Sequence, residues 1–197
     1  MEFFLIIKHE AKEWSRGRIW WLRLPLLLFF VYILFHHLKD PEYKSIIGPL
    51  NLGIHELGHV IFGLFGMFIG ILGGSLLQCL APVLAVFNFY KQKDFFAIAL
   101  CSGWLSTNLF EVATYVADAR SMKLPLVGFT TDPIHDWNYL LGKLNLLQHD
   151  QHIAALLRIS AVFFMLVCFI SGAWILWQMY ISGNDPSNNQ TTINWKL

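Results

Sequence analysis

Long apolar runs separated by short polar segments make up most of this chain. The run over residues 19–38 predicts a transmembrane helix, because about 20 apolar residues cross the hydrocarbon core of a bilayer. The runs over residues 95–117 and 159–181 predict two further spans by the same criterion. The pattern therefore predicts an all-α, polytopic integral membrane protein.

The stretch between Lys44 and Lys91 contains a single carboxylate, Glu56. Its length allows two membrane passages, or one passage and a re-entrant segment that enters and leaves on the same side. Gly73-Gly74 is the expected turn between the two parts. The chain as a whole is expected to have about five transmembrane helices, within a range of four to six.

The two ends of the chain differ from the apolar runs. Residues 1–18 mix basic, acidic and Trp side chains with a short apolar patch, so they predict an interfacial helix rather than a cleavable signal peptide. Their Lys and Arg excess favours a cytoplasmic N-terminus, although a turn at Gly73-Gly74 would then place Lys91 and Lys93 on the opposite side. One membrane-embedded domain is expected over residues 1–183, followed by a polar, disordered tail at 184–197.

Composition narrows the class of protein. Hydrophobic residues make up 56% of the chain and charged residues only 14%, against about 25% charged residues in soluble domains. The net charge of +1 gives no basis for nucleic-acid binding. Cys79, Cys101 and Cys168 all lie in apolar runs, which favours packing roles over disulfides or a cysteine-based zinc site.

The segment His55-Glu56-Leu57-Gly58-His59 carries the candidate chemistry. Positions four apart share one face of a helix, so His55 and His59 can offer imidazole nitrogens to one metal ion. Glu56 lies beside that face, where a carboxylate acts as general base toward water. Ionisable groups in an apolar segment are costly unless they serve a function. The pattern predicts a catalytic zinc site inside the membrane domain.

A catalytic zinc ion usually has three protein ligands, so a third residue is needed. Asp136 is the first candidate, because it lies at the start of a helix that Pro133 is expected to begin. His135 and Glu111 are the alternates, the latter as the lone carboxylate of its span. If Glu111 is not a ligand, it can orient a motif histidine through the free ring N–H, and Asn51 is a second candidate for that role.

With these residues the chain resembles the site-2 protease family of intramembrane zinc metalloproteases. The match lies in a hydrophobic helix followed by a Gly-rich segment, and its motif residues are His55, Glu56, Gly58 and His59. An Asp that opens a later helix extends the match. In that family the third ligand is an Asp in an LDG-type motif, often with Asn-Pro nearby, whereas Asp136 is flanked by His135 and Trp137.

The resemblance implies hydrolysis of peptide bonds in membrane-embedded or membrane-proximal substrates, with Zn²⁺ as cofactor and Glu56 as the catalytic base. The expected partners are a membrane protein or peptide substrate and the lipid bilayer. A membrane zinc hydrolase acting on a lipid amide or ester is an alternative, because one activated water serves any acyl group. A non-catalytic scaffold that retains the motif is another, although a metal-binding scaffold has no need of Glu56.

Overall fold

A computed structural model describes residues 2–126 and 134–184, and every regular element within them is helical. In chain order the elements are α1 (Glu2–Ser15), α2 (Leu24–Lys39), α3 (Gly48–Phe62), the 3₁₀ turn η1 (Gly63–Phe65), α4 (Met67–Lys91), α5 (Phe95–Ala117), α6 (Asp136–Lys143), the 3₁₀ turn η2 (Leu147–His149) and α7 (Asp150–Gly183). The all-α prediction is confirmed for this part of the chain. Apart from Asn184, the tail predicted to be disordered lies outside the described residues.

Three helical segments are long and apolar enough to cross a membrane: α4, α5 and residues Leu147–Gly183. This agrees with the predicted membrane protein. The apolar helix α2 has 16 residues and α3 has 15, so each is shorter than a typical span. The expected count of about five transmembrane helices is therefore not confirmed.

Two predicted helix starts differ from the structure. The first apolar helix begins at Leu24 rather than at residue 19, with Pro25 in its first turn, where the missing N–H of proline costs no hydrogen bond. The helix α6 begins at Asp136, and His135 is its N-cap. Pro133, which was expected to begin that helix, lies outside the described residues.

The prediction of a turn at Gly73-Gly74 is wrong, because both residues lie inside α4. The chain instead turns through η1 to Gly66, whose φ of +96° is a conformation that favours glycine. Gly73 serves a different purpose, since a Cβ atom on Gly58 of α3 would collide with its carbonyl oxygen. The glycines therefore allow α3 and α4 to pack backbone to backbone.

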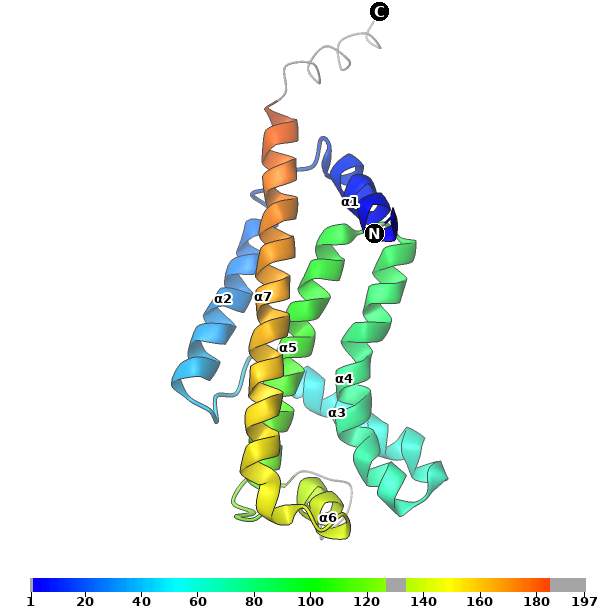
Figure 1. Ribbon diagram of the computed structural model, residues 1–197, viewed down its shortest axis with the longest axis vertical. Helices are drawn as coiled ribbons and strands as arrows, with labels where there is room; N and C mark the ends of the chain where they lie inside the picture. Colours follow the sequence, from blue (N-terminus) through cyan, green and yellow to red (C-terminus); the bar gives the residue numbers. More distant parts are fainter. Residues whose placement is uncertain (1, 127–133, 185–197) are drawn as a thin grey trace, which may run out of the picture.

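The helices form two groups on either side of α5 (Figure 1). α2 and α7 lie along α5 on one side, while α4 and the short, oblique α3 lie on the other. α1 lies across one end of the bundle, where Glu10 pairs with Lys93 of the turn between α4 and α5. α6 lies at the opposite end, beside the C-terminus of α5.

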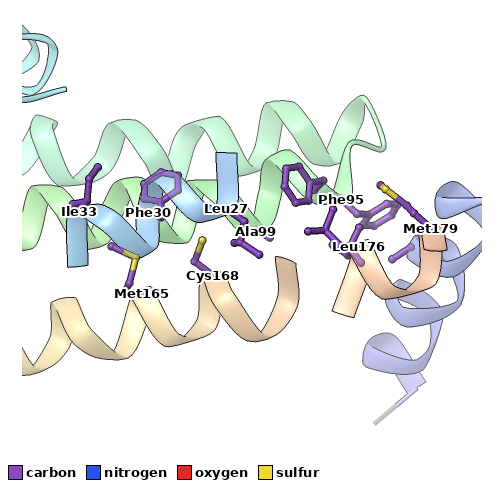
Figure 2. Packing of buried hydrophobic residues seen from close by; sticks show 12 residues of the cluster. Leu27, Phe30, Ile33, Phe95, Ala99, Met165, Cys168, Leu176 and Met179 are labelled. Atoms are coloured by element: carbon purple, nitrogen blue, oxygen red, sulfur yellow. The ribbon is translucent and has the colours of Figure 1, made fainter. Parts of the chain in front are cut away.

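The main apolar core fills the space between α2, α5 and α7 (Figure 2). Ile33 and Met165 are fully buried there, as is Cys168. Close approach depends on Gly103 of α5, where a Cβ atom would lie 2.8 Å from the Phe30 ring. All three cysteines of the chain are free. This core holds α2, α5 and α7 together and leaves the α3–α4 side to position polar groups.

Candidate metal site

The two motif histidines meet a carboxylate from a distant part of the chain. His55 and His59 lie on one face of α3 with their ring centroids 4.7 Å apart. Asp136 of α6 places its Oδ2 atom 2.9 Å from His55 Nε2 and 3.2 Å from His59 Nε2. Among the described residues, this group of His, Cys, Asp or Glu side chains could hold a metal ion, with ligand atoms within 4.8 Å of one another.

The other nitrogen of each imidazole has a partner of its own. His55 Nδ1 lies 3.0 Å from the Oε1 atom of Gln78, and His59 Nδ1 lies 2.9 Å from the carbonyl oxygen of Gly70. Both partners are acceptors, so each Nδ1 carries a proton and donates it. Each Nε2 faces Asp136, so it donates to that carboxylate when it carries a proton and offers a lone pair to a metal ion that takes the proton's place. Contacts of this kind set the tautomer and ring orientation of metal-binding histidines.

A buried polar network fixes the orientation of Gln78. Its Nε2 atom donates to Glu111 Oε2 at 2.9 Å, and Asn51 Nδ2 donates to the same oxygen at 2.9 Å. Trp104 Nε1 in turn donates to Asn51 Oδ1 at 2.8 Å. Because Glu111 Oε2 accepts from the amino group of Gln78, the carbonyl group of Gln78 is left for His55.

Asp136 is held at the start of α6 by several contacts with the end of α5. Its backbone N–H donates to the hydroxyl of Tyr115 at 3.0 Å. The preceding residue, His135, accepts the backbone N–H of Asn138 at Nδ1 and donates from Nε2 to Asp118 Oδ2 at 3.3 Å. These bonds pin the first turn of α6 and direct the carboxylate toward α3.

Asp136 and Asp118 both favour the charged form. Burial raises the pKa of Asp136, but hydrogen bonds with His55 and His59 outweigh it and leave the pKa below its usual value. Burial also acts to raise the pKa of Asp118. Hydrogen bonds from the Ser121 hydroxyl and two backbone N–H groups then lower that pKa below its usual value.

The space around the ligand nitrogens suits a small cation. Gly74 of α4 faces both rings, and a Cβ atom there would lie 2.6 Å from the Nε2 atoms of His55 and His59. Tetrahedral zinc with bonds of about 2.0 Å holds neighbouring ligand atoms about 3.3 Å apart. The two Nε2–Oδ2 distances are close to that value. Two imidazoles and one carboxylate are also a donor set that zinc accepts.

Glu56 lies beside this group and is not part of it. Its side chain is half-buried, and its charge is close enough to act on His59 and Tyr115. Glu56 is thus a carboxylate next to the group that is not itself one of its members, as a general base would be.

The structure separates the three candidates for the third ligand. Asp136 joins the histidines, whereas His135 uses both ring nitrogens elsewhere and Glu111 contacts Gln78 and Asn51. Glu111 thus acts on His55 through Gln78 rather than directly. Sequence reasoning missed Gln78, although a strongly polar side chain within a long apolar run was a usable signal.

Comparison with protein-family models, curated proteins and solved structures finds no match for this chain. The resemblance to site-2 proteases accordingly remains an interpretation of the motif. Any functional conclusion depends on the chemistry of the site itself.

Proposed function

We propose that this protein is a membrane-embedded zinc metalloprotease that hydrolyses peptide bonds of membrane-embedded or membrane-proximal substrates. One observation carries the proposal: His55, His59 and Asp136 converge, and both histidines have Nδ1 engaged and Nε2 directed at the carboxylate. Glu56 beside this group supplies the base that a site built only for metal storage would not need.

Each side chain of the site has a separate role in the proposed hydrolysis. Zn²⁺ held by His55, His59 and Asp136 would supply Lewis-acid activation of water and of the scissile carbonyl group. Glu56 takes a proton from the attacking water and returns it to the leaving amine, so the carboxylate is regenerated in each cycle. Gln78 keeps His55 in the tautomer that directs Nε2 inward.

The proposal includes a membrane arrangement with four crossings, by α2, α4, α5 and α7. Both α2 and α3 are short, but α2 lies along α5 and α7, whereas α3 lies oblique to them (Figure 1). In this arrangement α2 crosses with the residues that flank it, and α3 enters without crossing. α1 lies at the cytoplasmic surface. The contact between Glu10 and Lys93 supports this, because it brings the α4–α5 turn to the same side as the basic N-terminus.

This arrangement predicts the accessible side of each turn. In a chain whose native cysteines are replaced, Lys91→Cys should react with an impermeant thiol reagent only from the cytoplasmic side. Lys143→Cys in α6 should react only from the other side. Labelling of both positions from one side would contradict the four-span arrangement.

The test of the enzymatic proposal combines metal content with peptide cleavage by the detergent-purified protein. The parent should hold about one zinc ion per chain and cleave a peptide that contains a transmembrane segment. Glu56→Gln should keep the zinc and lose cleavage, whereas His59→Ala should lose both. Metal-free parent protein would refute the proposal and favour the scaffold. Zinc-dependent hydrolysis of lipid extracts without peptide cleavage would favour the lipid hydrolase.

A further inference from the structure

A pocket of about 370 Å³ lies between α2, α5 and α7, on the side of α5 that faces away from the metal site. Phe110, Ile159 and Val162 contribute apolar lining, and His37 and Arg158 contribute polar groups. None of its lining residues belongs to the metal site or to the network that orients Gln78. The pocket is therefore separate from the candidate metal site, and the proposed hydrolysis does not account for it.

His37 leaves one buried nitrogen unused beside this pocket. The residue is 5% exposed, and its ring stacks on Phe110 with centroids 4.5 Å apart and planes 7° from parallel. Within the described residues, its Nε2 atom has no hydrogen-bond partner. Buried polar atoms in folded proteins nearly always have one. Because His37 lines the pocket, a ligand that reached this nitrogen would supply the missing partner.

Arg158 leaves a positive charge unpaired at the same place. It lies half-buried in α7, directly before the charge-free run at residues 159–181, and so at one end of the apolar zone. Across the part of the chain that the structure describes, it forms neither an ion pair nor a side-chain hydrogen bond. Asp40, the nearest carboxylate to the end of α2, instead accepts the backbone N–H of Glu42.

We propose that this pocket binds an anionic phospholipid from the surrounding bilayer, with an acyl chain against Phe110, Ile159 and Val162. The lipid phosphate lies at Arg158 and accepts a hydrogen bond from His37. An arginine fork matches phosphate oxygens, and a negatively charged headgroup balances a cation that the protein leaves unpaired. The position at the end of the apolar zone matches the depth of a headgroup.

Native mass spectrometry of the full chain in detergent tests the headgroup. We compare phosphatidylglycerol with phosphatidylcholine of identical acyl chains. The parent should retain phosphatidylglycerol about tenfold more tightly, and Arg158→Gln should remove that preference, as expected for loss of one charge-assisted contact. Lys143→Gln removes an exposed charge at the same end of the molecule and should change nothing.

A second variant tests the acyl chain separately. Val162→Phe narrows the apolar part of the pocket and keeps Arg158, so it should weaken both lipids by a similar factor. His59→Ala should bind lipid as the parent does, which separates this proposal from the hydrolase proposal. Equal retention of the two lipids by the parent, or phosphatidylglycerol binding unchanged in Arg158→Gln, would overturn the proposal. Circular dichroism of each variant establishes that its helices are intact.

Discussion

The two sides of α5 are held together by different means. Toward α2 and α7, fully buried apolar side chains such as Ile33 and Met165 fill the interface (Figure 2). Toward α3 and α4, the fully buried side chains include Asn51 and Asn108, and the helix backbones meet at glycines such as Gly58. The interface with α2 and α7 is thus mainly apolar, and the one with α3 and α4 is polar.

This difference separates the residues that mainly stabilise the fold from those that orient the side chains of the candidate metal site. Burial of apolar area contributes gradually and without direction, so a lost methyl group weakens the apolar interface without changing its nature. Hydrogen bonds have donors and acceptors, and one reversed amide at Gln78 would change which nitrogen of His55 carries the proton. We therefore expect changes on the α3–α4 side to alter metal binding and changes on the other side to alter stability.

Gly74→Ala should have the largest effect on metal binding. Its methyl group would lie 2.6 Å from both ligand Nε2 atoms. Changes that only misorient a ligand cost about 10- to 100-fold in metal affinity, and a methyl group between the ligands should exceed that range. Zinc affinity by competition with a chromogenic chelator gives the measurement. Gly53→Ala in α3 is the control, since a Cβ atom there has nothing within 4 Å. Parent-like zinc affinity in Gly74→Ala would place the metal elsewhere.

Removal of the acceptor for His55 should have the next largest effect. Gln78→Leu should lower zinc affinity by about 10- to 100-fold, because His55 Nδ1 loses the partner that sets its tautomer. The paired change Gln78→Glu with Glu111→Gln exchanges the two groups and again offers an acceptor to His55. This double variant should regain most of the affinity. If it binds no better than Gln78→Leu, the hydrogen-bond direction is not what matters.

His135→Ala should have a smaller effect and distinguishes a capping residue from a ligand. Loss of the N-cap side chain costs about 1 kcal/mol, which corresponds to roughly a fivefold loss of zinc affinity if all of it acts on Asp136. Asp136 keeps its backbone bond to Tyr115. Isothermal titration calorimetry with zinc measures the affinity of the parent and of the variant. A loss as large as that of Asp136→Asn would make His135 a ligand.

Met165→Ala should have the smallest effect on the metal and a large one on stability. Met165 is fully buried between α2, α5 and α7, and truncation of such a residue costs about 2–5 kcal/mol of unfolding free energy. The zinc content per folded molecule should stay unchanged. Thermal unfolding in detergent and metal analysis of the folded fraction provide the two values. Leu156→Ala on the exposed face of α7 is the matched control. Metal loss without destabilisation would contradict the division between the two interfaces.

Much of the candidate site follows from local pattern. The spacing of His55 and His59 places both on one helix face wherever that helix lies, because the 3.6-residue period is a property of the backbone. Asp136 could be ranked first because the sequence placed it in the first turn of an expected helix. The turn was misplaced at Gly73-Gly74, because glycine serves both turns and close helix contacts, and sequence does not distinguish them.

The sequence by itself determined the helical class, the apolar character and the two histidines with their neighbouring carboxylate, since these depend on composition and on spacing within one helix. Only the tertiary structure decided that Asp136 completes the group, that Glu111 acts through Gln78, and that Gly74 leaves the ligand nitrogens clear. These relations join residues on separate helices. Their geometry follows from how α3, α4, α5 and α6 pack, and no spacing along the chain encodes it directly.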